Sequence, residues 1–248
     1  MGDIKVNLLS SQEEINRRAV FLEKLKNSPI PDNEILDNLG LYIKRQALSR
    51  TLFMHEIYQQ IINVHGVVME FGVRWGQNLS LFSSFRGIYE PYNYNRKIIG
   101  FDTFDGFPNV HEKDGNRVKE GDYRVTDNYE EYLNSVLTYH EAESPLSHIK
   151  KFELVKGDAS VTIDTYLEQH PETIVALAYF DFDIYTPTKK CLEAIKDRLT
   201  KGSIVAFDEL NYDLFPGETL ALKEVFGLDK YRIRRTPLAP LCSYIIIE

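Results

Sequence analysis

Four acidic residues follow two apolar runs of the chain, and carboxylates in such positions are suited to bind a hard cation or to move a proton. The acids are Asp181, Asp183, Asp208 and Glu209. The runs before them, residues 174–180 and 204–207, lack the polar alternation of a one-faced sheet and therefore predict buried parallel strands. Because ligands of an open α/β sheet bind just beyond the carboxyl ends of its strands, we expect the four acids to share one site.

The residues alone leave three roles open for these carboxylates. An unpaired buried carboxylate is too costly to keep, so each acid must bind a metal ion, exchange a proton or pair with a basic side chain. The candidates for structural ion pairs with the last two acids are Arg74, Lys189 and Lys190. Asp183 has a further structural alternative, as the cap of a helix that starts at about Pro187. The convergence of four acids on neighbouring strand ends favours a functional site.

The turn after the first predicted strand, residues 66–71, is the first of three earlier strand ends that could hold a ligand. Gly72 and Gly76 let the backbone pass close to a small molecule, and Glu70 points into the same space. A Gly-x-x-x-Gly spacing alone is equally typical of a packing turn.

The next two strand ends each carry an aspartate. Asp102 follows an apolar strand and is placed to hold the hydroxyl groups of a ribose. Asp158 can accept a hydrogen bond from the exocyclic amine of an adenine, with Ala159 near the ring. The structural alternative is that Asp158 or Ser160 caps the helix expected from about Val161.

The pattern of the chain changes near residue 65. Residues 1–64 show helical periodicity and no strand, which predicts an N-terminal helical cap or lid. In residues 65–248 short apolar strands alternate with amphipathic helices, which predicts one compact α/β unit around a parallel sheet. Residues 232–234 and 243–247 lie too close in sequence for a helical crossover and predict an antiparallel hairpin.

Composition excludes several partners. The 248 residues carry a net charge of -8, which argues against a nucleic-acid backbone as the partner and favours a small molecule. Cys191 and Cys242 have no paired metal spacing, so we expect a reduced, cytoplasmic protein without disulfides. We expect no signal peptide or membrane span, and Val6 stands where a myristoylation signal requires Ser or Thr.

Two further features keep alternative roles. The polar segment 109–127 is predicted to be a lid or substrate loop, and His111 on this loop is an alternative base. Arg232, Arg234 and Arg235 either clamp a pyrophosphate or guard a strand edge or subunit contact.

Five motifs in order along the chain carry a resemblance to a known family. They are Glu-Phe-Gly-Val-Arg-Trp-Gly, Gly-Phe-Asp-Thr-Phe-Asp-Gly-Phe-Pro, Lys-Gly-Asp-Ala, Phe-Asp-Phe-Asp-Ile-Tyr-x-Pro-Thr and Phe-Asp-Glu. Their combination, over roughly residues 35–248, resembles the S-adenosylmethionine-dependent sugar O-methyltransferases of the macrocin and novobiocin type, especially the dTDP-6-deoxy-L-hexose 3-O-methyltransferases. The resemblance implies a class I methyltransferase fold, Rossmann-like, with a seven-stranded, mostly parallel sheet and an antiparallel last strand.

The resemblance implies that S-adenosylmethionine binds at the first three strand ends. Glu70, Gly72 and Gly76 would line the methionine part of the cofactor. Asp102 would hold its ribose, and Asp158 its adenine. The other implied cofactor-binding residues are Val73, Asn78, Thr103, Phe104, Ala159 and Asp181.

The resemblance also divides the four acids into roles. In the related enzymes the first Asp of an Asp-x-Asp motif and two adjacent acids on the next strand bind Mg²⁺. This implies Asp181, Asp208 and Glu209 as ligands of Mg²⁺ or another divalent cation, and Asp183 as the general base. A hard cation would grip two neighbouring hydroxyl groups, lower the pKa of one and aim its oxygen at the methyl group. The relatives carry paired Asp where this chain has Asp208-Glu209, so Glu209 is the least secure ligand.

The resemblance thus implies transfer of a methyl group to a hydroxyl, at O-3, of a dTDP-linked deoxysugar by a homo-oligomeric enzyme. A catechol-type small-molecule O-methyltransferase is an alternative with the same cofactor and metal. An NAD-dependent sugar oxidoreductase is another, although Arg74 and Trp75 stand where a dinucleotide-binding turn needs small residues. A non-catalytic interaction module is the third.

Overall fold

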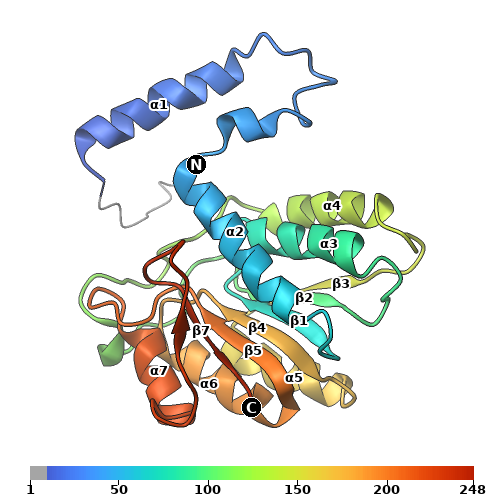
Figure 1. The fold of residues 1–248 in the computed structure, drawn as a ribbon. Helices are drawn as coiled ribbons and strands as arrows, with labels where there is room; N and C mark the ends of the chain where they lie inside the picture. Colours follow the sequence, from blue (N-terminus) through green and yellow to red (C-terminus); the bar gives the residue numbers. More distant parts are fainter. Residues whose placement is uncertain (1–9) are drawn as a thin grey trace.

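The computed structural model describes residues 10–248 (Figure 1). Residues 1–9, on which the expectations about a signal peptide and myristoylation rest, lie outside the described part. The α-helices are α1 Gln12–Lys26, α2 Arg45–Gln60, α3 Gln77–Tyr89, α4 Tyr129–Ala142, α5 Ala159–Gln169, α6 Tyr185–Ile195 and α7 Gly217–Val225. The 3-10 helices are η1 Leu39–Tyr42, η2 Glu112–Asp114 and η3 Lys196–Arg198. The strands are β1 Val67–Phe71, β2 Ile98–Asp102, β3 Phe152–Lys156, β4 Val175–Phe180, β5 Leu199–Phe207, β6 Arg234–Arg235 and β7 Ser243–Ile246.

All seven strands belong to one sheet with the order β3-β2-β1-β4-β5-β7-β6. The pairs within β1 to β5 are parallel, and β7 is antiparallel to both β5 and β6. Every residue of β4 is buried, as expected for a strand covered on both faces. The predicted parallel sheet with an antiparallel hairpin at its C-terminal end is confirmed.

Helices cover both faces of the sheet (Figure 1). On one face α2, α3 and α4 contribute side chains such as Phe53 and Phe82 to a buried cluster with the strands. On the other face α5, α6 and α7 do the same, with Ile163 and Leu192 fully buried. Because helices pack on both faces of the sheet, the strands hold the loops at their carboxyl ends at fixed distances from one another.

The N-terminal segment contains one helix that packs on the sheet and one that does not. In α2 the side chains of Phe53, Met54, Ile57 and Tyr58 are fully buried, which confirms the helix predicted there. Helix α1 has no buried residue and projects away from the sheet (Figure 1). The division into a cap of residues 1–64 and a domain of residues 65–248 stays a prediction. Among the described residues, no helix has the length and hydropathy that crossing a membrane requires.

Candidate active site

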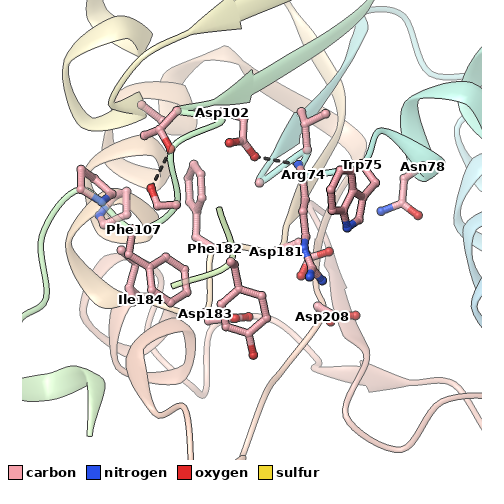
Figure 2. A pocket seen from close by; sticks show the side chains of 18 of the residues that line it. Arg74, Trp75, Asn78, Asp102, Phe107, Asp181, Phe182, Asp183, Ile184 and Asp208 are labelled. Atoms are coloured by element: carbon pink, nitrogen blue, oxygen red, sulfur yellow. Dashed lines mark hydrogen bonds between the residues drawn. The ribbon is translucent and has the colours of Figure 1, made fainter. Parts of the chain in front are cut away.

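The carboxyl ends of β1 to β5 surround a cavity of about 320 Å³ (Figure 2). The loop after β2 closes one side of it with Phe107 and Tyr123. Every residue predicted for the site lines this cavity except Glu70, Gly76 and Phe104. The structure therefore brings the implied cofactor residues and the four acids into one space.

Close packing within the protein explains the two glycines after β1. Gly72 has a φ of 97°, and a Cβ there would lie 2.1 Å from the carbonyl oxygen of Asp181. Gly76 has a φ of 74°, and a Cβ there would lie 2.3 Å from a methyl carbon of Leu133. The sequence left a close approach of the ligand and a packing turn as equal alternatives for these glycines; the contacts with the protein match the packing turn, and only Gly72 also lines the cavity.

Glu70 lies behind the cavity wall and reaches it through Asn78. Its Oε1 accepts a hydrogen bond of 2.8 Å from Asn78 Nδ2. Glu70 Oε2 and Asn78 Oδ1 are buried and have no hydrogen-bond partner among the described residues. Burial raises the pKa of Glu70 well above its usual range. The pair thus leaves two buried polar oxygen atoms without a partner, and of the two residues Asn78 lines the cavity.

The aspartates that follow β2 and β3 are held by the main chain around them. Asp102 accepts hydrogen bonds from the backbone N–H of Arg74 at 2.7 Å and of Phe104 at 2.6 Å. Phe104 therefore contributes through its backbone, which accounts for its absence from the cavity lining. Asp158 accepts from the backbone N–H of Ser160 at 2.9 Å and caps α5. The structural alternative for Asp158 is thus observed, and the residue also lines the cavity.

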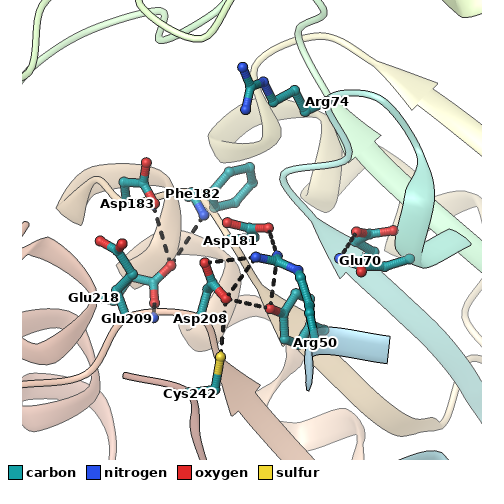
Figure 3. Close-up of polar contacts among 12 residues, drawn as sticks. Arg50, Glu70, Arg74, Asp181, Phe182, Asp183, Asp208, Glu209, Glu218 and Cys242 are labelled. Carbon is teal, nitrogen blue, oxygen red and sulfur yellow. Dashed lines mark hydrogen bonds and ion pairs between the residues drawn. The ribbon is translucent and has the colours of Figure 1, made fainter. Parts of the chain in front are cut away.

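A basic residue from α2 lies in the middle of the acid cluster (Figure 3). Arg50 Nη2 contacts Asp181 Oδ2 and donates to the hydroxyl oxygen of Tyr179 at 3.1 Å. Arg50 Nη1 lies 3.1 Å from Oδ1 and 3.2 Å from Oδ2 of Asp208. The same Oδ1 accepts hydrogen bonds from the Tyr179 hydroxyl at 2.9 Å and from the Cys242 thiol at 3.2 Å. Arg50 thus joins the ends of β4 and β5.

A buried glutamate supports the backbone that carries the other acids (Figure 3). Glu218, in the first turn of α7, is fully buried. Its Oε1 accepts from the backbone N–H of Phe182 at 3.2 Å and of Asp183 at 3.3 Å, and its Oε2 accepts from Glu209 N–H at 3.3 Å. Asp183 has a left-handed φ of 62°, a strained conformation that its surroundings must hold. Burial, and then the carboxylates of Asp181 and Glu209, raise the pKa of Asp183 well above its usual range.

The structural roles considered for the acids are wrong in detail. Lys189 and Lys190 pair with Glu224 and Asp164, at 2.8 and 2.9 Å, instead of with the acids on β5. Asp183 is not a helix cap, because α6 begins after the following residue and its N-cap makes no side-chain hydrogen bond.

The segment 109–127, predicted as a lid or substrate loop, is anchored beside the cavity. The buried side chain of Asp114 accepts a 2.6 Å hydrogen bond from the backbone N–H of Tyr185. The guanidinium carbon of Arg74 lies 5.1 Å from the centroid of the Tyr123 ring. Arg74 therefore faces the loop and not the acids on β5, contrary to the ion pair considered for it.

The basic cluster and the alternative base both lie outside the cavity lining. Arg234 and Arg235 form the edge strand β6, and Arg232 is exposed just before it. Their position agrees with the strand-edge alternative. His111 Nδ1 accepts from the backbone N–H of Lys113 at 3.1 Å at the start of η2.

The acids as arranged do not fit the metal site that the resemblance implies. Mg²⁺ requires nearly octahedral oxygen ligands at about 2.0–2.1 Å. In residues 10–248 no three His, Cys, Asp or Glu side chains converge so that they could hold a metal ion. Asp181 and Asp208 contact Arg50 instead. Burial, and then Asp208 and Asp181, raise the pKa of Glu209 to about 8.

Sequence reasoning missed Arg50, Tyr179 and Glu218. Arg50 had a usable signal, because it stands three and seven residues before the buried Phe53 and Ile57 and so lies on the buried stripe of its helix. Tyr179 stands two residues before the first acid and shares its face of the strand. Glu218 had no local signal, since its hydrogen-bond partners are remote in the sequence.

The strand order, with antiparallel β7 between β5 and β6 and a cavity at the strand ends, is that of a class I methyltransferase. No protein-family profile and no curated protein matches the chain. Among solved structures, CalS11, a calicheamicin methyltransferase, matches with a TM-score of 0.93 and 43% identity, over 99% of this chain and 97% of that one. Its apo structure, described as a TDP-rhamnose 3'-O-methyltransferase, matches with a TM-score of 0.86 and 42% identity over 98% of both chains.

A more distant match shares the fold alone. The O-methyltransferase NovP has a TM-score of 0.61 and 18% identity, over 80% of this chain and 79% of that one. On the identity and coverage of CalS11, the chain belongs to the S-adenosylmethionine-dependent sugar O-methyltransferases, as the sequence predicted. The alternatives of an NAD-dependent oxidoreductase and of a non-catalytic module are therefore wrong.

Proposed function

We propose that the protein transfers a methyl group from S-adenosylmethionine to the 3-hydroxyl group of a deoxysugar linked to deoxythymidine diphosphate. The observation that carries the proposal is that one cavity has Asp102 on one side and Asp183 and Asp208 on the other (Figure 2). The acceptor class is supported by CalS11, 42% identical in its apo structure, whose description names TDP-rhamnose and its 3' oxygen.

The residues at the ends of β1 to β3 suit S-adenosylmethionine. The unpaired atoms Asn78 Oδ1 and Glu70 Oε2 would accept from the ammonium group of its methionine part, whose positive charge favours the ionised form of Glu70. Backbone amides fix the carboxylate of Asp102, whose remaining lone pairs can accept from the ribose hydroxyl groups. Asp158 and Ala159 would lie at the adenine. The remaining proposed contacts are Gly72, Val73, Thr103 and Asp181, which line the same cavity.

Asp183 is proposed as the general base on the acceptor side. When bound, the cofactor supplies an electrophilic methyl group on a sulfonium. The sugar hydroxyl oxygen forms a bond to the methyl carbon as the bond from that carbon to sulfur breaks, and the hydroxyl proton passes to Asp183. Glu218 holds the backbone of Asp183 in place, and the loop residues Phe107 and Tyr123 limit access of water.

We also propose that the chain forms a homo-oligomer through its N-terminal segment. Helix α1 has no buried residue, yet it exposes Val20, Phe21 and Leu22, and the segment after it exposes Leu36 and Leu41. Contiguous exposed apolar surface is typical of protein contacts. Light scattering of the full chain should show an oligomer that Phe21→Ser weakens, and a monomer in both cases would contradict the proposal.

A binding and transfer experiment tests the function. Trp75 is the single tryptophan and lines the cavity, so its fluorescence should report S-adenosylmethionine binding. The protein is then incubated with the cofactor and either TDP-rhamnose or a catechol, and the masses of the products are determined by mass spectrometry. We expect saturable binding and a methyl gain on the sugar nucleotide. Absence of cofactor binding overturns the proposal, and transfer to the catechol alone would make the enzyme a small-molecule O-methyltransferase.

A further inference from the structure

Arg50 bridges the two carboxylates that the resemblance assigns to a divalent cation (Figure 3). One Nη atom contacts Asp181, the other lies 3.1 Å from Asp208, and Tyr179 hydrogen-bonds to both Arg50 and Asp208. The planar fork of a guanidinium suits two carboxylates at once, which a point charge such as an ammonium group does not.

The bridge is partly shielded from water. The side chains of Arg50, Asp181 and Asp208 are 31%, 24% and 15% exposed, respectively. Removing the cation from such a pair leaves neighbouring like charges unpaired and poorly solvated. The buried acids Asp183 and Glu218 lie close by, and burial, followed by the neighbouring carboxylates, raises the pKa of both, so further negative charge is disfavoured there. A cation therefore stabilises the two carboxylates, and in this arrangement the chain itself supplies it.

We propose that Arg50 is the built-in counter-ion of Asp181 and Asp208 and that a divalent cation binds these carboxylates only by displacing it. A metal ion at about 2.0–2.1 Å from the same oxygen atoms would overlap the Nη atoms that contact them, and two adjacent cations repel each other. Metal and Arg50 are thus alternative occupants of one position. This competition goes beyond the proposed function and determines how readily the acceptor side takes up a metal.

Metal affinity in the absence of substrate tests the competition. Binding of Mn²⁺ is measured by calorimetry for the wild-type chain, for Arg50→Gln and for Arg45→Gln, a control at an exposed position on the same helix. Because Gln removes the competing charge, we expect the dissociation constant of Arg50→Gln to fall at least about tenfold, with the control within about twofold of wild type. Equal or weaker binding by Arg50→Gln would overturn the proposal.

A second substitution locates the gained site. Adding Asp208→Asn to Arg50→Gln should abolish the gain, since it removes one of the two carboxylates. A gain that persists in the double variant would place the ion elsewhere and also overturn the proposal.

A milder variant covers the case in which Arg50→Gln does not fold, judged by circular dichroism. Arg50→Lys keeps the charge but loses the fork that joins the two carboxylates, so we expect Mn²⁺ affinity about threefold or more above wild type. Affinity equal to wild type would contradict the competition. Metal binding is measured without turnover, so it tests the role of Arg50 even if no acceptor is methylated. A failure of methyl transfer would overturn the proposed function but not the competition between Arg50 and the metal.

Discussion

The two sides of the cavity are constructed differently. On the side of β2 and β3, Asp102 and Asp158 are held by backbone N–H groups, two residues away at Phe104 and Ser160 and 28 residues away at Arg74. On the side of β4 and β5, Asp181 and Asp208 are held by Arg50, 131 and 158 residues away along the chain. The hydroxyl and amine groups of a cofactor can each be bound by one carboxylate that nearby backbone groups hold in place. Several adjacent carboxylates, in contrast, repel each other and need partners that other elements bring in.

This difference implies different responses to substitution. Changes on the first side should alter cofactor affinity and leave the rest of the fold intact. Changes on the second side should alter the rate of methyl transfer or the stability of the fold, because the same groups serve both.

The largest effect is expected for the base. Asp183→Asn removes the group proposed to accept the hydroxyl proton, so the rate of methyl transfer should fall about 10²–10⁴-fold. The affinity for S-adenosylmethionine should change little, because Asp183 lies on the acceptor side. Steady-state kinetics and Trp75 fluorescence provide the two readouts. Asp213→Asn, at a nearby exposed position, is the control, and a rate within tenfold of wild type would remove Asp183 from the role of base.

The next largest effect is expected on cofactor affinity, from a substitution on the β2 and β3 side of the cavity. Asp102→Asn removes the charge and replaces one acceptor by an amide nitrogen, so the side chain cannot keep both backbone N–H bonds, from Arg74 and Phe104, and still accept as a carboxylate from the ribose hydroxyl groups. A hydrogen bond to a charged group contributes about 1.5–3 kcal/mol, so cofactor affinity should fall about 10–100-fold. Calorimetry measures the affinity for S-adenosylmethionine, and Asp105→Asn, at an exposed position, is the matched control. Unchanged affinity would mean that the ribose is held elsewhere.

A moderate effect on stability is expected from the glutamate behind the acids. Glu218→Gln retains one acceptor and loses the other, so a backbone N–H of Phe182, Asp183 or Glu209 is left without its bond. The free energy of unfolding should fall by about 1–3 kcal/mol. Urea unfolding checks this against the exposed Glu193→Gln. Equal stability of the two variants would show that Glu218 does not support the acid side.

The smallest effect is expected at the edge of the sheet. Arg235→Ala removes an exposed side chain outside the cavity lining, so stability should change by no more than about 0.5 kcal/mol. The KM for the TDP-sugar should stay as in wild type. A tenfold rise in KM would instead show that this cluster reaches the pyrophosphate of the acceptor.

The predictions from the sequence succeeded where local pattern determines structure. Apolar runs ending in acids placed Asp102 and Asp181 at strand ends, and the short spacing before Ser243–Ile246 predicted the antiparallel hairpin. The partners of the acids were not predicted in this way. Arg50 and Glu218 meet the acids only after helices from both ends of the chain pack on the sheet, and no pattern near the acids identifies them. The metal site was implied by the resemblance to the sugar O-methyltransferases, and motifs shared with a family do not reveal that a side chain of the same protein contacts the carboxylates.

The position of the transferred methyl group tests the central claim most directly. The purified chain is incubated with TDP-rhamnose and with S-adenosylmethionine that carries an isotope-labelled methyl group, and the product is examined by two-dimensional NMR. If Asp183 is the base of a sugar 3-O-methyltransferase, the expectation is one labelled O-methyl signal at carbon 3 of the sugar with the wild-type chain, and a signal reduced at least about 100-fold at equal time with Asp183→Asn. No labelled sugar with the wild-type chain, or equal labelling by the variant, would contradict it.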